Sequence, residues 1–427
     1  MEESEEREGK GGSITLYNNE FYNAIMDEDL EYMEGVSRKH GSNFLIQIQG
    51  SPGDVFWKGL GLGSAVIPLH LAASYRRVKS MQMLLSAGVD PEIRDQLGRT
   101  TLHLVIASWP SICTRLPNPG SKFPTAMMSV HRRAEACLQL LCEHGVNVNA
   151  EVEGEGHETA LHLAVRYTAL SAVHILASYG ANVNAVDSSG MTPLHMAAGM
   201  LHKDLIASLI KEGADINTGV HHSGITPLHL AAVAMAMKTT KTLEDDMSCV
   251  SELLEQGAEV DAVNSAGLTP LQEACSMSNK ELVELLLRHG ANVNKLNTAG
   301  ENCLFLFLNH RPNVRNSSLL VKLISLTSPL TVYNQSGRLP STLMLPCFFK
   351  QRDQLLKLSQ QPRRLQDICK IDIYLKQAQR KRGEVRKMLP EKLYDFVYNS
   401  WENLHNISFE TDDEQELFND LSGVTPS

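Results

Sequence analysis

The chain has 427 residues and a formal net charge of −10 at pH 7, with 43% hydrophobic and 21% charged residues. This composition is typical of a folded globular protein, and the acidic balance argues against a general nucleic-acid partner, which requires a basic surface. Only 6% of the residues are aromatic, which favours helices rich in Leu, Ala and Val over sheets.

The first residues, 1–14, are acidic and polar, and they predict a disordered N-terminus without the apolar stretch of a secretory signal. Residues 15–64 follow as a degenerate capping repeat, in which 21–43 forms two helices and the Gly-rich stretch 44–64 forms a loop. The apolar run 231–237 falls far short of the roughly 20 residues that cross a bilayer. We therefore expect no membrane partner and an intracellular protein, cytoplasmic or nuclear.

Self-comparison gives the strongest signal, because seven segments of the type TPLHLAA align without gaps. Successive aligned leucines are 33, 59, 33, 34, 43 and 33 residues apart, so one period recurs and two units carry insertions. The aligned leucines are Leu69, Leu102, Leu161, Leu194, Leu228, Leu271 and Leu304. The predicted units are 65–95, 96–150, 151–185, 186–218, 219–262, 263–295 and 296–334.

Each unit also contains a second apolar helix that ends in a glycine turn, as in VHILASYGANVNA at 173–185. This two-helix pattern resembles the ankyrin repeat, and the resemblance covers about four-fifths of the chain. It implies an all-α fold, an ankyrin-repeat solenoid of helix-turn-helix units. In such a solenoid, stability comes from stacking neighbouring repeats, because one repeat cannot bury its apolar face alone.

The residues of one unit explain its local structure. Thr226 is placed to cap the first helix, and Pro227 stands at the first helical position, where a missing N–H costs nothing. Leu228 points into the stack, while His229 reaches neighbouring backbone. Gly290 ends a second helix in a left-handed conformation.

The leucine and histidine of this motif recur at fixed positions, so we interpret them as structural rather than catalytic or metal-binding. These positions are Leu69, His70, Leu102, His103, Leu161, His162, Leu194, His195, Leu228, His229 and Leu271. The sequence contains no phosphate-binding loop, no HExxH, no GxSxG and no paired acid–base constellation. We therefore predict no enzyme activity, no cofactor and no metal.

The cysteines support the same view, because they contain no CxxC pair and most fall within apolar helical patterns. We expect reduced, buried thiols. A zinc site formed by Cys137, Cys142 and His144 is the alternative, but no nearby residue supplies a fourth ligand.

Both insertions are predicted to be loops that leave the stack between the two helices of a unit. The first runs from about Trp109 to His131, and its four prolines argue against a helix. The second spans about 235–247 and is rich in charge. Either loop could contact a partner, or it could be tolerated surface growth.

Residues 335–361 predict a half-repeat cap, and residues 362–404 predict two further helices. Leu365, Ile368, Cys369 and Ile373 form one stripe of the first helix, and Leu389-Pro390 precedes the second. This segment resembles a SOCS box, which implies contact with elongin through the stripe and with a cullin through Leu389 and Pro390. Arg364, Asp372 and Glu391 depart from that pattern. The alternative is that these helices only cap the array, and the acidic tail 405–427 is predicted to be disordered.

Two functions follow from these observations. The first is a non-enzymatic scaffold, a monomer that binds unidentified protein partners on its ankyrin surface. The second is a substrate receptor of an elongin/cullin ubiquitin ligase, with elongin B/C as partner. A subsidiary possibility, implied by the resemblance to ankyrin repeats, is hydroxylation of turn asparagines that lie eight residues after a leucine. The pairs with this spacing are Leu141–Asn149, Leu176–Asn184, Leu209–Asn217 and Leu286–Asn294.

Overall fold

The computed structural model describes residues 6–8, 14–17, 19–40, 44–47, 65–110, 123–154, 156–237, 243–361, 365–377 and 388–398. The chain divides into two compact units. The first comprises Met1–Ala197 and Asp204–Asp215, and the second comprises Ala198–Lys203 and Ile216–Ser427.

The first unit begins with a small sheet and a helix pair. Strands β1 (Glu6–Glu8), β2 (Ile14–Tyr17), β3 (Leu45–Gln47) and β4 (Ala65–Val66) lie in the order β1-β2-β3-β4, with only the β2–β3 pair parallel. Helices α1 (Asn19–Asp27) and α2 (Leu30–His40) occupy the place predicted for the capping repeat and pack on the first two repeat helices.

This sheet differs from the predicted disorder of 1–14 and the predicted loop over 44–64. Its apolar strand residues explain the difference, because Phe44 and Ile46 are buried and the Phe44 ring meets the Phe21 ring edge-on at 5.1 Å between centroids. The polar strand β1 is held by backbone pairing to β2, which needs no apolar side chains.

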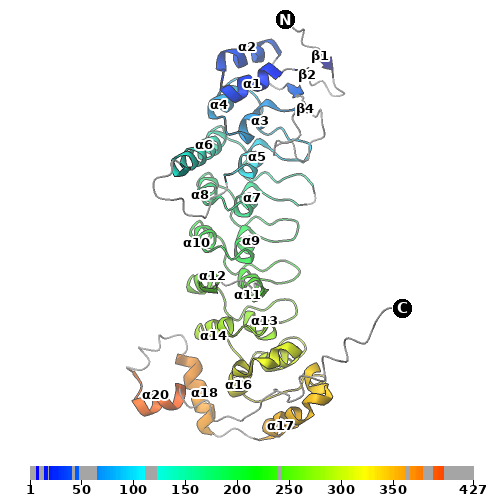
Figure 1. Cartoon of the computed structure of the whole chain (residues 1–427), viewed down its shortest axis with the longest axis vertical. Helices are drawn as coiled ribbons and strands as arrows, with labels where there is room; N and C mark the ends of the chain where they lie inside the picture. The colour runs from blue at the N-terminus through cyan, green and yellow to red at the C-terminus, as the bar shows by residue number, and fades with distance from the viewer. Residues whose placement is uncertain are drawn as a thin grey trace, which may run out of the picture. The chain divides into compact units, whose positions relative to one another are not determined.

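Seven helix pairs follow, as the repeat predicts (Figure 1). In the first unit the pairs are α3 (Pro68–Ser74) with α4 (Val78–Ser86), α5 (Thr101–Ala107) with α6 (Phe123–Glu143), and α7 (Ala160–Arg166) with α8 (Leu170–Ser178). The fourth pair is α9 (Pro193–Gly199) with α10 (Lys203–Lys211). The second unit contains α11 (Pro227–Met237) with α12 (Leu243–Glu255), α13 (Pro270–Ser276) with α14 (Lys280–Arg288), and α15 (Cys303–Leu308) with α16 (Ser317–Leu326).

The aligned leucines form the core of the stack. All seven are buried, and the first helices that carry them pack on one another within each unit, as α3 does on α5 and α11 on α13. A short helix of seven residues is unstable alone, so this burial against neighbours holds each one in place.

The predictions of a loop at both insertions are wrong in part. Helix α6 begins at Phe123, inside the predicted loop, and Pro124 is tolerated because it stands in the first turn, where no helical hydrogen bond is lost. In the fifth repeat α11 extends to Met237 and α12 begins at Leu243, so only 238–242 lies outside the described residues.

A third insertion, in the seventh repeat, was not predicted. The segment η2 (Arg311–Arg315), a 3-10 helix, lies between α15 and α16. The buried amide of Asn313 attaches it to the sixth repeat by donating to the carbonyl oxygen of Ser276 at 2.6 Å. All three insertions therefore lie at the same junction of a repeat, between its first and second helices.

Among the described residues, the C-terminal part contains three more α-helices. The short 3-10 segments η3 (Ser341–Met344) and η4 (Pro346–Phe348) lead into α17 (Phe349–Gln360), at the place predicted for the half-repeat cap. Helices α18 (Leu365–Gln377) and α20 (Glu391–Tyr398) pack on each other, and α18 also contacts α14. The predicted tail at 405–427 lies outside the described residues.

Candidate interaction surface

In four repeats, the threonine before the first helix and the histidine inside that helix form a local lock. In the third repeat, Nδ1 of His162 accepts the backbone N–H of Thr159 at 3.2 Å and lies 2.9 Å from the Thr159 hydroxyl. The same pair of contacts recurs between Thr100 and His103, Thr192 and His195, and Thr226 and His229. An otherwise unpaired N–H at the helix start is satisfied in this way.

The opposite ring nitrogen reaches the next turn. Nε2 of His103 lies 3.0 Å from the Ala150 carbonyl oxygen, and Nε2 of His162 lies 3.1 Å from that of Met191. His70 and His229 make equivalent contacts to Ile93 and Leu268. A ring that accepts at Nδ1 and donates from Nε2 is neutral, and it joins the first helix of its repeat to the turn that leads into the next repeat.

Burial keeps these rings neutral. Desolvation lowers the pKa of His70 and of His103 to about 4, although the hydrogen bonds to carbonyl oxygens partly oppose that effect. The pKa values of His162 and His229 are lowered for the same first reason. A buried ring with both nitrogens engaged has no free position for a substrate or a metal, and His103, His162 and His229 are of this type.

Two repeats reach the same result with other residues. In the sixth, the carboxamide of Gln272 accepts the Thr269 N–H at 2.9 Å and donates to the Lys295 carbonyl at 2.8 Å. In the seventh, Phe305 replaces the histidine, and Asn302 caps the helix while donating to the Thr331 carbonyl at 3.1 Å.

Turn asparagines form a second link between repeats. The side-chain oxygen of Asn149 accepts the Asn182 N–H at 2.7 Å, and that of Asn184 accepts the Asp215 N–H at 2.8 Å. In the second unit, Asn294 accepts the Ser328 N–H in the same way at 2.8 Å. These asparagines are three of the four candidate hydroxylation positions, and their side chains are engaged between neighbouring turns.

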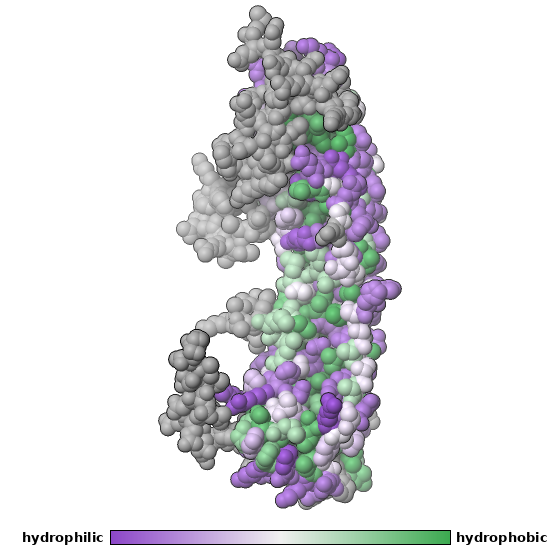
Figure 2. Space-filling model, turned by 90° about the vertical axis from the view of Figure 1, so that its right-hand side faces the viewer, coloured by the Kyte–Doolittle hydropathy of each residue, from purple (hydrophilic) through white to green (hydrophobic). Residues whose placement is uncertain are grey.

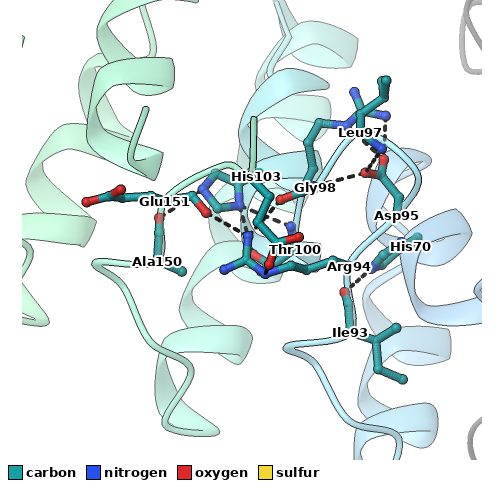
Figure 3. A network of polar contacts seen from close by, with 12 residues as sticks. His70, Ile93, Arg94, Asp95, Leu97, Gly98, Thr100, His103, Ala150 and Glu151 are labelled. Carbon is teal, nitrogen blue, oxygen red and sulfur yellow. Dashed lines mark hydrogen bonds and ion pairs between the residues drawn. The ribbon is translucent and has the colours of Figure 1, made fainter. Parts of the chain in front are cut away.

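The turn between the first two repeats shows how closely the backbones approach (Figure 3). Arg94 extends along this turn and donates from Nη1 to the carbonyl oxygens of Gly98 and Glu151, at 2.7 and 2.6 Å. Gly98 has a φ of +71°, and a Cβ there would lie 2.4 Å from the Cβ of Glu153. Only glycine fits this place, where the turn touches the next one.

Away from these locks, the turns expose varied side chains. Figure 2 looks onto the side of the projecting turns and shows hydrophobic residues interspersed with hydrophilic ones. Within the second unit, Val263, Leu296 and Tyr333 stand just before the turn asparagines Asn264, Asn297 and Asn334 of three successive turns, and they are 47%, 54% and 46% exposed. This row was not predicted from the sequence, although the constant offset from the turn asparagine could have identified it.

The predicted elongin stripe lies on one face of α18. Leu365, Ile368 and Cys369 are exposed, Leu365 by 76%, whereas Ile373 is half-buried. The opposite face packs inward, with Ile371 buried and the Tyr374 ring centroid 5.9 Å from the ammonium of Lys322. Of the predicted cullin contacts, Leu389 is half-buried and Pro390 is exposed at the start of α20.

The structure gives no support to the zinc alternative. Cys137 and Cys142 are buried, and burial raises their thiol pKa values to about 12 and about 11, which disfavours the thiolate that zinc binds. Nδ1 of His144 lies 2.8 Å from the Leu140 carbonyl oxygen. Over the residues that the structure describes, no group of three or more metal-binding side chains occurs, and no helix is both long and apolar enough to cross a membrane.

Family models support the repeat assignment. A model for a single ankyrin repeat matches residues 67–96, a model for many copies matches 161–207, and a model for three copies matches 237–316. Together with the helix pairs, these matches confirm the predicted fold class, an all-α ankyrin-repeat solenoid.

Curated relatives are similar over part of the chain. The nuclear factor NF-kappa-B p105 subunit of Gallus gallus is 35% identical over 162 residues, which are 35% of this chain and 16% of that protein. The neurogenic locus notch homolog protein 1 of Homo sapiens is 32% identical over 244 residues, 56% of this chain and 9% of that protein. The chain thus spans a small part of the length of these relatives.

Two solved ankyrin repeat domains are similar to part of the chain. That of human ASB11 is 26% identical, with a TM-score of 0.42 and coverage of 56% of this chain and 90% of that one. That of Bcl-3 is 23% identical, with a TM-score of 0.45 and coverage of 56% and 92%.

Proposed function

Because its repeats are ankyrin repeats, we propose that this chain is a non-enzymatic scaffold for protein–protein interaction. The proposal rests on the different roles of side chains inside the repeats and side chains exposed on the turns. Histidine and asparagine side chains at fixed positions hold neighbouring turns, and the threonines hold the histidines, while the exposed turn positions differ from one repeat to the next. A constant frame with a variable surface suits recognition of a protein partner.

The more detailed expectations belong to this proposal. The partner is a protein bound on the repeat surface, the scaffold acts as a monomer inside the cell, and neither nucleic acid nor membrane is its target. The net charge of −10 supports the expectation about nucleic acid.

Affinity capture with the full chain tests the scaffold function. The comparison variant carries Leu296→Ser and Tyr333→Ser, which alter two exposed turn positions but none of the locks. We expect a specific protein to be captured by the original chain and lost with this variant, at an unchanged melting temperature. Identical captures by both chains would contradict a binding role for the turns.

A second candidate function is substrate recognition for an elongin/cullin ubiquitin ligase. The exposed apolar stripe of Leu365, Ile368 and Cys369 favours it, because α18 already buries its opposite face against the repeats. Exposed apolar side chains on one face of a helix suit docking into a partner's groove. Leu389 and Pro390 would then contact a cullin. The half-buried Ile373 and the exposed Asp372 weaken the match.

Co-expression of the full chain with elongins B and C tests this candidate. The stripe variant carries Leu365→Ala and Cys369→Ala, and its matched control carries Met128→Ala at an exposed position of α6. A complex that survives in the control but not in the stripe variant is the expected result. Failure of the folded original chain to form a complex would leave α18 and α20 as packing elements only.

A further inference from the structure

One position of the inner helices departs from its counterparts. The residue two places after the aligned leucine is apolar in six repeats and is Glu273 in the sixth. The six apolar counterparts are Leu71, Leu104, Leu163, Met196, Leu230 and Leu306. The repeat fold therefore does not require a carboxylate here.

Glu273 is also poorly compensated. It is half-buried, and burial raises the pKa of its carboxyl above the ordinary value. Its carboxylate accepts from the side-chain amide of Asn264, at 3.4 Å from Oε1, and no cation pairs with it among the described residues. The start of α13 stabilises negative charge to some extent, but the raised pKa shows that burial outweighs this effect.

Apolar residues take the positions equivalent to Glu273 on both neighbouring inner helices. Helix α13 packs between α11 and α15, whose half-buried Leu230 and Leu306 take the equivalent position. The turn that supplies Asn264 also carries the exposed Val263, and the next turn carries Leu296. A second carboxylate, Glu301, accepts from the Asn297 amide of that next turn at 2.9 Å.

From this arrangement we propose that the surface formed by Leu230, Val263, Glu273, Leu296 and Leu306 binds a protein segment in which a lysine or arginine is flanked by apolar side chains. The carboxylate of Glu273 pairs with the lysine or arginine of the segment, and the four apolar residues contact the side chains that flank it. A charged hydrogen bond is strong where water is partly excluded. The segment's cation therefore supplies the positive partner that the carboxylate of Glu273 lacks among the described residues. The net charge of −10 also attracts a basic segment.

This inference rests on the scaffold function and specifies the partner's chemistry. Its test is selection of a random peptide library on the full-length chain, followed by affinity measurement of the selected peptides by fluorescence anisotropy. The variant is Glu273→Gln, which keeps size and removes charge. The matched control is Glu281→Gln, at an exposed acid of the second helix α14.

We expect selected peptides to combine lysine or arginine with apolar residues and to bind Glu273→Gln about tenfold more weakly, as for loss of a charged hydrogen bond. The same peptides should bind Glu281→Gln to within about twofold, as for an exposed charge. Peptides that bind but are insensitive to Glu273→Gln would overturn this inference and leave the scaffold function standing. No selected peptide at all would count against both.

A second measurement separates recognition from structure. Glu273→Leu restores the residue type of the other repeats, so its melting temperature should rise while the selected peptides are lost. A fall in the melting temperature would mean that Glu273 stabilises the fold, and the inference would fail.

Discussion

The carboxamide of Gln272 accepts the backbone N–H of Thr269 at 2.9 Å, the place that a histidine ring nitrogen takes in other repeats. Its amide nitrogen then donates to the following turn, as Nε2 of the histidine does. The two side chains therefore have the same role because each presents an acceptor and a donor at a similar separation.

The first prediction follows from this equivalence. His162→Gln should melt close to the original protein, whereas His162→Ala should lose about 1–3 kcal/mol because the Thr159 N–H and the Met191 carbonyl lose their partner. Thermal unfolding monitored by circular dichroism measures both. Equal losses for Gln and Ala would show that the volume of the ring matters more than its hydrogen bonds.

The second prediction concerns pH. Unfolded histidines take up protons below about pH 6.5, whereas the folded His70 and His103 do so only near their lowered pKa of about 4. The unfolded state therefore binds more protons between these values, and stability should fall as the pH drops from about 6.5 to about 4. Melting temperatures across this range check the slope, and His103→Gln should make it shallower. A melting temperature that does not change over this pH range would show that the buried neutral histidines do not make stability depend on pH.

The third prediction tests the stack. Leu228 is buried, so Leu228→Ala should cost about 2–5 kcal/mol by lost contacts and a cavity. The exposed Leu296 provides the control, and Leu296→Ala should change stability by no more than about 0.5 kcal/mol. Chemical denaturation of both variants gives the comparison. An unchanged Leu228→Ala midpoint would contradict a core formed by the aligned leucines.

The fourth prediction concerns backbone strain between the helices of a repeat. Thr168 has a φ of +53° between α7 and α8, a left-handed conformation that a β-branched residue adopts at a cost. Thr168→Gly should therefore stabilise the chain by about 0.5–1 kcal/mol, after allowance for the greater freedom of unfolded glycine. Ser178→Gly, at the last residue of α8, should instead destabilise it. Differential scanning calorimetry distinguishes the two, and a lower melting temperature for Thr168→Gly would refute the strain argument.

The pair of helices in each repeat was predictable because its sequence pattern occurs seven times in one chain. Seven aligned leucines gave the period, and the pattern around Thr226 and Gly290 gave the helix boundaries. Gly290 does adopt a positive φ of +87°. A pattern that recurs in many repeats is recognised even where one repeat is irregular, and the helix pair is the part of the structure that all repeats share.

The features that occur once were harder to predict. Pro124 argued against a helix only because its place in the first turn of α6 was unknown. The strand at Leu45–Gln47 depends on distant partners, and so does the attachment of Asn313 to Ser276. Glu273 was visible as an exception in the alignment, but its lack of a cationic partner needed the folded neighbours.

The added segments of the second, fifth and seventh repeats have a practical consequence. All three enter between the first and second helices, whereas the turns that join repeats carry the His, Gln and Asn links. Extra length at that junction costs little closure entropy and leaves the links untouched. It is therefore the place to graft an epitope or a fluorophore site, so that a reporter can be attached without changing the surface that a partner reads.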